Sequence, residues 1–255
     1  MAKQAADVIL TDDNFATIVA AVEEGRTIYS NLRKSIRYLL SSNAGEVFTV
    51  FFGVALASSI GLTSPDGSFV APLLATQILW INLLTDAAPA LALGVDPASP
   101  GLMARRPRSS REHLIDTEMW LGILVVGTTM AIGTLLTLDL ALPGGLIDGD
   151  RGIAEARTMA FTVLVLAQLF NVFNARSDRT SAFRSGLANR TLWGAIGLSV
   201  GLQILVVYAP MFHRAFGTAG IDAADWGICI AMASLVLWVD EVWKLTKRAR
   251  ARQMD

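Results

Sequence analysis

The feature that most constrains this chain is a series of six long apolar segments separated by short polar stretches. A helix of about 20 apolar residues crosses the roughly 30 Å hydrocarbon core of a bilayer. An open strand would leave backbone polar groups unpaired in lipid, so these segments are expected to be helices. We predict an all-α integral membrane protein, a bundle of six transmembrane helices at about 39–60, 72–94, 119–142, 158–173, 192–211 and 226–245.

The composition agrees with a membrane protein. Hydrophobic residues make up 53% of the chain and charged residues only 17%, whereas soluble domains contain about 25% charged residues. The net charge of −1 gives no reason to expect nucleic acid as a partner. The two histidines, His113 and His213, are far apart and lack metal-ligand spacing.

Basic residues alternate between the connections and predict the orientation. Four Lys or Arg residues lie shortly before the first span, four follow the second and four follow the fourth. Five lie at the end of the sixth span and in the tail, whereas each other connection has two or fewer. Because cytoplasmic loops carry the excess of Lys and Arg, both termini are expected in the cytoplasm. We expect an integral protein of a bacterial plasma membrane, with membrane lipid as a partner.

The N-terminal residues have a different pattern. Ala6–Leu10 is typical of a short buried strand, and Phe15, Ile18 and Val22 then recur at helical spacing, on a helix that Gly25 could interrupt. A lone strand has no ladder partner, which indicates the remnant of a larger soluble domain. We therefore divide the chain into residues 1–26, a strand–helix remnant, and residues 27–255, the transmembrane domain.

Two acidic residues lie well inside predicted spans, Glu46 in the first and Asp86 in the second. A charged side chain at the bilayer centre costs about 2.5–3.5 kcal/mol on insertion scales, so it needs a reason. Asn43 shares a helical face with Glu46, and Asn82 and Thr85 share one with Asp86. Pro89 has no N–H, which frees the carbonyl of Thr85 as a further oxygen ligand.

Gln168 and Asn171 add a third polar face in the fourth span. Carboxylate, amide and carbonyl oxygens together suit a hard cation such as Ca²⁺. Two other interpretations remain open: hydrogen bonds that merely join helices, and a proton relay through Glu46 and Asp86. A secondary transporter ranks lower, because the acidic, Pro-interrupted helix occurs once rather than in two repeats.

Several motifs resemble the type II P-type ATPases, the family of the sarcoplasmic reticulum calcium pump. Ser42–Glu46 resembles part of the family's fifth transmembrane helix, and Leu79–Asp86, with Pro89 and Ala92–Gly94, resembles the sixth. Leu102–Arg108 resembles the loop that follows the sixth helix. Ala5–Arg26 resembles the last strand and helix of the phosphorylation domain. The resemblance covers nearly the whole chain, which would then comprise the family's helices five to ten.

The resemblance implies a pump cycle in which ATP phosphorylates a cytoplasmic aspartate and the fifth helix transmits the change to the cation site. By position it assigns cation ligands, with Gln168 where the two-site calcium pump has a glutamate. That difference favours a single-site pump. Calcium is the expected cation, and Mn²⁺, Mg²⁺ or Na⁺ stay open. The assigned metal ligands are Asn43, Glu46, Asn82, Thr85, Asp86 and Gln168.

The family's phosphorylation, nucleotide-binding and hinge motifs do not occur in this sequence. We therefore expect no catalytic residue here and no ATP hydrolysis by this chain alone, with ATP and Mg²⁺ acting only through domains on an N-terminal pump half. A split gene or a truncated fragment would explain such a sequence. The alternative is a stand-alone, non-enzymatic membrane module that binds a partner or conducts ions passively.

Overall fold

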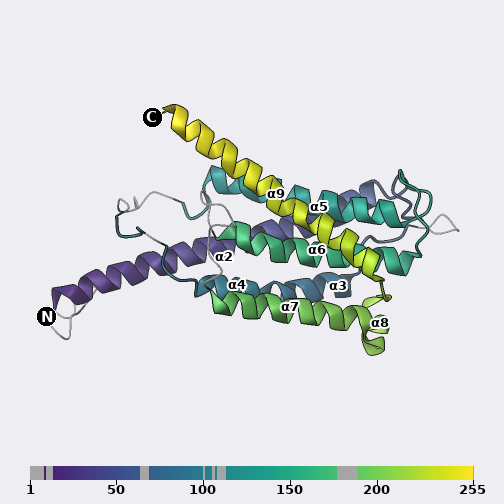
Figure 1. Ribbon diagram of the computed structural model, residues 1–255, viewed down its shortest axis with the longest axis horizontal. Helices are drawn as coiled ribbons and strands as arrows, with labels where there is room; N and C mark the ends of the chain where they lie inside the picture. The colour runs from purple at the N-terminus through teal and green to yellow at the C-terminus, as the bar shows by residue number, and fades with distance from the viewer. Residues whose placement is uncertain are drawn as a thin grey trace.

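The computed structural model describes residues 9, 14–63, 69–99, 101–104, 107, 113–176 and 189–254. Within them the fold is helical, with one isolated bridge between Thr63 and Phe69 and no named strand. The predicted strand Ala6–Leu10 lies outside the described residues except for Ile9. The elements are α2 (Phe15–Ala55), α3 (Ala75–Trp80), η1 (Ile81–Thr85), α4 (Ala87–Gly94), α5 (Thr117–Ala141), α6 (Ile153–Ala175), α7 (Arg190–Tyr208), α8 (Pro210–Phe216) and α9 (Ala223–Met254) (Figure 1).

Helix α2 is one continuous helix of 41 residues, about 60 Å long at the rise of an α-helix. It runs through Gly25 without interruption, so the helix of the predicted remnant and the first predicted span form a single rod. Its buried residues recur every three or four positions from Asn31 to Gly53, whereas its first turns project beyond the bundle (Figure 1). The division of the chain at residue 26 falls inside this rod and stays a prediction.

The segment predicted as the second span is a broken helix. Helix α3 is followed by the π-helix η1, in which the Asp86 N–H donates to the Ile81 carbonyl five residues back at 2.9 Å. Helix α4 then begins at Ala87, two residues before Pro89. A π-turn widens the helix by one residue and is frequent at functional sites. The acidic residue Asp86 lies at the junction.

Three predicted spans correspond to the helices α5, α6 and α7, which are long and apolar enough to cross a membrane. Helix α6 is the most buried of them and packs against both α5 and α9, which also contact each other. Helix α9 crosses the other two at an angle (Figure 1). The other predicted spans correspond to the second half of α2, to α3–η1–α4 and to α9, and the total of six stays a prediction. Several helices have other ends than predicted. Helix α2 stops at Ala55, and α7 stops at Tyr208 because the chain turns before Pro210. Helix α6 begins earlier, at Ile153, and α9 continues to Met254.

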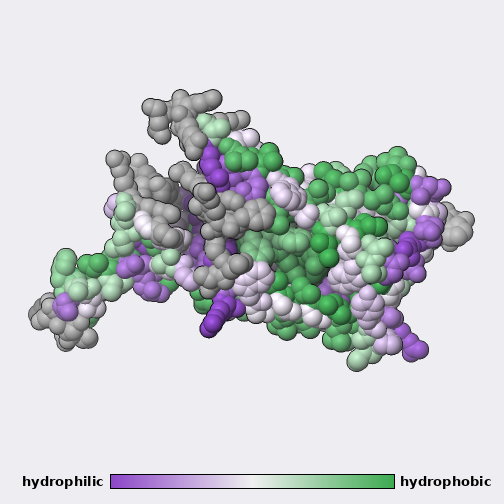
Figure 2. Space-filling view, viewed as in Figure 1, coloured by the Kyte–Doolittle hydropathy of each residue, from purple (hydrophilic) through white to green (hydrophobic). Residues whose placement is uncertain are grey.

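The visible face of the molecule matches a membrane protein. Hydrophobic residues cover the middle of the bundle, and hydrophilic residues gather towards its two ends (Figure 2). Exposed hydrophobic side chains of the helices predicted to span the membrane include Phe51, Leu79, Leu83, Leu198 and Trp238. An apolar band of this kind is what a lipid-facing surface requires.

Candidate functional site

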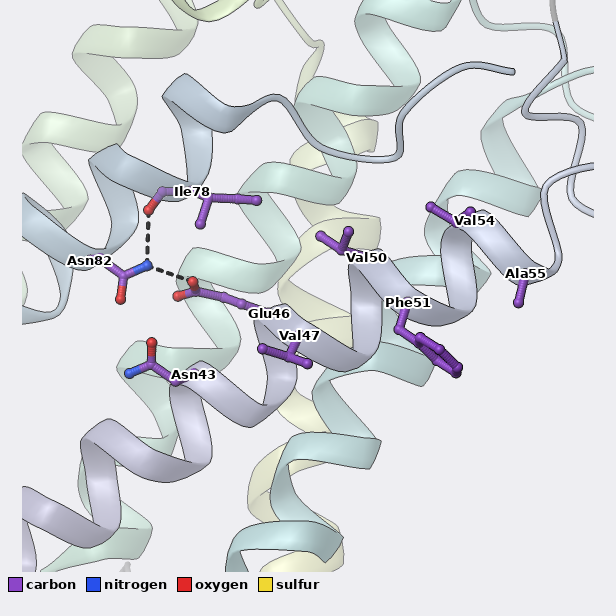
Figure 3. Close-up of a pocket in the computed structure, with 9 residues that line it drawn as sticks. All are labelled: Asn43, Glu46, Val47, Val50, Phe51, Val54, Ala55, Ile78 and Asn82. Carbon is purple, nitrogen blue, oxygen red and sulfur yellow. Dashed lines mark hydrogen bonds between the residues drawn. The ribbon is translucent and has the colours of Figure 1, made fainter. Parts of the chain in front are cut away.

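Glu46 is the centre of a polar junction between three helices. It lies on the buried face of α2 and is only 4% exposed. Asn82 of η1 donates from Nδ2 to one of its carboxylate oxygens at 2.6 Å, and Gln168 of α6 donates from Nε2 to the other at 3.0 Å. Figure 3 shows Asn82 reaching Glu46 across the gap between α2 and η1. The structure thus brings together three of the predicted site residues from three separate helices.

Asp86, the second acidic residue, is 1% exposed and faces the bundle rather than lipid. The hydroxyl of Tyr38 on α2 donates to its Oδ1 at 2.8 Å. Its Oδ2 is buried and has no hydrogen-bond partner among the described residues. Both carboxylates therefore point inward, and one oxygen of Asp86 is left for a ligand.

The Thr85 carbonyl, expected to be free, has a partner from another helix. Ser199 of α7 donates its hydroxyl to this oxygen at 3.1 Å. The Thr85 hydroxyl itself donates to the Ile81 carbonyl at 3.0 Å, within the broken helix. The Thr85 carbonyl thus accepts a hydrogen bond from α7, which occupies one of its two lone pairs.

Asn43 lies one turn before Glu46 and is exposed, with its amide donating to the Leu39 carbonyl at 2.8 Å. It lines an open groove of about 700 Å³ together with Glu46 and Asn82. The rest of the groove wall is apolar and runs along α2 towards Ala55 (Figure 3). The groove thus gives the polar junction at Glu46 a path to the surface of this chain.

The amides of α6 divide into two kinds. Gln168 contacts Glu46, and its own carbonyl oxygen is buried without a partner among the described residues. Asn171 instead donates to the Ser41 hydroxyl at 2.7 Å, and Asn174 donates to the Val236 carbonyl at 3.0 Å. These last two amides join helices, as intramembrane Asn often does. Of the three, Gln168 alone lies at the carboxylates.

Sequence reasoning missed two residues of this region, Tyr38 and Ser199. Tyr38 lies eight residues before Glu46, so helical periodicity places it on the same face of α2, where its hydroxyl could have been noticed. Ser199 carries no comparable signal, because a single serine in an apolar helix is common. Only the packing of α7 against α4 and η1 reveals it.

The polar atoms at the site include oxygens of the kind that bind hard cations. The hydrogen bonds to Glu46 and Asp86 come from neutral amide and hydroxyl donors. Within the described ranges, no group of three or more His, Cys, Asp or Glu residues could hold a metal ion, so a cation here would need neutral oxygens beside the two carboxylates. Oxygen ligands of this mixture suit a hard cation.

The comparisons with known proteins agree on one family. A model of the family described as "Cation transporting ATPase, C-terminus" matches residues 70–246. The chain is 37% identical over 235 residues to a "Calcium-transporting ATPase" of Bacillus subtilis, which covers 92% of this chain and 25% of that protein. It is 38% identical over 251 residues to "Calcium-transporting ATPase 1" of Schizosaccharomyces pombe, covering 98% and 26%.

A third relative is the "Probable cation-transporting ATPase F" of Mycobacterium tuberculosis, 37% identical over 256 residues, with 99% of this chain and 26% of that protein covered. The chain therefore spans about a quarter of the length of the curated relatives that it matches.

Proposed function

The chain belongs to the type II P-type cation-transporting ATPases, as their C-terminal region, and from this premise we propose that it is the cation-translocating membrane part of an ATP-driven pump for Ca²⁺. The observation that carries the proposal is the pair of buried acids, Glu46 and Asp86, whose hydrogen-bond partners are neutral side chains: Tyr38, Asn82 and Gln168. Burying two carboxylates is costly, and a transported cation provides the charge that offsets the cost. The names of the relatives in Bacillus and Schizosaccharomyces support calcium.

Glu46 would exchange its partners when the cation binds. Asn82 and Gln168 now donate N–H groups to the two oxygens that the cation would take. On binding, the two amides turn their carbonyl oxygens towards the cation, since an amide offers a donor at one end and an acceptor at the other. The buried and unpartnered carbonyl oxygen of Gln168 supports this exchange.

We propose that Asp86 and the Thr85 carbonyl complete the ligand set from the broken helix. Asp86 contributes its unpartnered oxygen, and Thr85 contributes the second lone pair of its carbonyl. Asn43 is a more peripheral ligand from the groove side of α2, where it lies beside Glu46 and Asn82. These groups would form a single cation site whose ligands are carboxylate oxygens and neutral oxygens.

The proposed orientation has six spans with both ends of the chain in the cytoplasm. The start of α2 and the end of α9 project from the same end of the bundle (Figure 1). Basic side chains on these two helices, among them Lys34 and Lys247, support the cytoplasmic side for that end because of the positive-inside rule. In this arrangement α2 extends from the cation site into the cytoplasm as one rod.

We propose that the remaining three quarters of such a pump supply the ATP chemistry and further ligands. The groove beside Glu46 is lined mainly by apolar side chains, which suits a further transmembrane helix better than open water. Phosphorylation by ATP, with Mg²⁺, would take place in the cytoplasmic domains of that part. This chain by itself would then bind the cation weakly and hydrolyse no ATP.

The test is ATP hydrolysis by the full-length gene product in lipid vesicles, with Ca²⁺, Mn²⁺, Mg²⁺ and Na⁺ added in turn. We expect stimulation by Ca²⁺, and we expect Glu46→Gln and Asp86→Asn each to abolish it because each removes a charged ligand. Asp150→Asn is the matched control, since that side chain is 98% exposed on a loop far along the chain from the site. Normal stimulation in both site variants would defeat the assignment.

The stand-alone module makes a different prediction for the same preparation. If no cation stimulates hydrolysis and the chain is made without a catalytic half, passive ion flux through vesicles that contain only this chain becomes the informative measurement. A gene that lies directly downstream of a reading frame with the family's hinge motif would instead favour the split pump.

A further inference from the structure

The carbonyl of Thr85 lacks the donor that a regular α-helix would give it. Residue 89, which would normally donate to it, is a proline without an N–H. The next N–H along the helix, that of Ala90, donates to the Asp86 carbonyl at 3.1 Å instead. The Thr85 oxygen therefore receives neither of these two main-chain donors and is open to a donor from another helix.

Ser199 of α7 is the side chain that approaches it. It is completely buried, and its hydroxyl lies 3.1 Å from the Thr85 oxygen. Helix α7 lies alongside α4 and η1 over much of its length (Figure 1). The bond thus connects a helix without acidic residues to the ion-binding segment.

A second hydrogen bond, one helical turn after Ser199, fixes the position of α7. Gln203 is completely buried and donates from Nε2 to the Thr162 hydroxyl of α6 at 3.0 Å. Residues four apart lie on one face of a helix, so Ser199 and Gln203 attach the same face of α7 to two different neighbours. Sliding or turning α7 would break both bonds, which makes the register of Ser199 on Thr85 well defined.

We propose that Ser199 is a positioning residue for the transported cation. It holds the Thr85 carbonyl in a fixed direction through one lone pair and leaves the other lone pair for the cation. This inference rests on the proposed function and adds α7 to the elements that form the site. It also assigns a role to Pro89, because a proline at this position lacks the N–H that would otherwise compete with Ser199 for the Thr85 carbonyl.

The first test is Ser199→Ala in the full-length pump, measured as Ca²⁺ concentration dependence of ATP hydrolysis and as equilibrium binding of radioactive Ca²⁺ without ATP. Removing a partner that orients a metal ligand typically weakens binding about 10–100-fold. We expect a Ca²⁺ affinity lower by about tenfold in both measurements, with the rate at saturating Ca²⁺ retained. Ser199→Thr keeps the hydroxyl and should restore the affinity.

Ser234→Ala is the matched control. That serine lies on α9, where its hydroxyl donates to the Ala231 carbonyl of its own helix, so its loss should leave Ca²⁺ affinity unchanged. If Ser199→Ala instead lowers the rate at saturating Ca²⁺ and leaves the affinity unchanged, Ser199 has a structural role only and the proposal is wrong.

A double-mutant cycle with Pro89→Ala makes the test specific to the Thr85 oxygen. The alanine restores an N–H that can donate to this carbonyl, so the serine hydroxyl becomes redundant. We expect Ser199→Ala to change Ca²⁺ affinity much less in the Pro89→Ala background than in the wild type. Equal effects in the two backgrounds would overturn the inference.

The outcomes separate this inference from the function on which it rests. A wild-type pump that neither binds Ca²⁺ nor responds to it contradicts the proposed function. A wild-type pump that responds to Ca²⁺, with Ser199→Ala indistinguishable from it, contradicts only the role of Ser199. Should Ser199→Ala fail to accumulate in membranes, Ser199→Cys, which retains a weaker donor of similar size, must show an intermediate affinity.

Discussion

Glu46 and Asp86 are held by different chemistry although both are buried acids. Two amide N–H groups contact Glu46, whereas a single phenolic hydroxyl contacts Asp86. Amide side chains can turn to present either a donor or an acceptor, but the hydroxyl of Tyr38 must move away or rotate its hydrogen before Oδ1 can bind a cation. The two acids are therefore expected to respond differently when a partner is removed.

Tyr38→Phe tests the hydroxyl at Asp86. The ring packing is kept, and a buried carboxylate loses its hydrogen bond, which typically contributes about 1.5–3 kcal/mol. We expect the free energy of unfolding of this chain in lipid nanodiscs to fall by about 2 kcal/mol without added cation. Tyr38→Phe in an Asp86→Asn background is the control: the hydroxyl then faces a neutral side chain, so a loss nearer 1 kcal/mol is expected. Equal losses would show that the carboxylate is not what makes the Tyr38 bond matter.

Among the elements, α2 and α5 approach each other closely because small residues face one another. A side-chain carbon added at Gly127 of α5 would lie 2.8 Å from the Ala44 Cβ and 3.1 Å from the Gly45 main-chain nitrogen. Gly45 is equally confined, since an added carbon there would lie 2.8 Å from the Met130 sulfur. Without a hydrophobic driving force between helices in lipid, close contact of this kind stabilises helix pairs. It also fixes the stretch of α2 that carries Glu46.

Gly127→Ala should separate the two helices. The contacts are with backbone and Cβ atoms, which cannot swing aside, so overpacking of about 1–3 kcal/mol is expected. Unfolding in SDS–detergent mixtures measures the loss. Gly197→Ala on α7 is the matched control, because nothing lies within 4 Å of the added carbon and alanine is the better helix former. A Gly127→Ala protein as stable as the control would mean that α2 and α5 pack more loosely than described.

At the scale of the whole molecule, Asp96 joins four helices at the end where α2 projects. It follows α4 and is 4% exposed. Lys34 of α2 lies 2.8 Å from one of its oxygens, and Arg176, directly after α6, lies 3.1 Å from the other. Asn189, which caps α7, donates to it at 2.9 Å. A movement of α2 would therefore disturb contacts with α4, α6 and α7 at the same time.

The ion pairs of Asp96 should make the stability of the chain depend on pH. Burial raises the pKa of Asp96, but the hydrogen bonds from Lys34 and Asn189, with the Lys34 charge and Arg176, outweigh burial and lower the pKa below its usual value. A lowered pKa means that the stabilisation is complete above the unfolded value of about 3.9 and is lost as pH falls below it. We expect the unfolding temperature of the chain in nanodiscs to fall between about pH 5 and pH 3.

Asp96→Asn should remove much of that dependence. It should also lower stability at neutral pH by about 3–5 kcal/mol, because Lys34 is left as a buried charge without its carboxylate. Asp150→Asn, on an exposed loop, should keep the wild-type pH profile. A profile for Asp96→Asn that is parallel to that of the wild type would assign the acid sensitivity to other carboxylates.

The sequence by itself determined the class of the protein and the identity of the acids. Apolar segments long enough to span lipid must be helical whatever they pack against, and the all-helical membrane bundle and the ATPase family are confirmed. A carboxylate inside such a segment stands out for the same reason, so Glu46 and Asp86 could be found without a structure. These are local properties, set by residue type, length and the solvent.

The tertiary structure decided which neutral groups meet those acids. Tyr38 reaches Asp86 across 48 residues of sequence, and Ser199 reaches Thr85 across 114. The tertiary structure also decided where the π-helix η1 forms. It decided as well that Gln168 contacts Glu46, whereas the nearby Asn171 joins α6 to α2 through Ser41. Helical periodicity tells which residues share a face of one helix. It does not tell which face of another helix lies opposite, because that depends on the packing of all the helices at once.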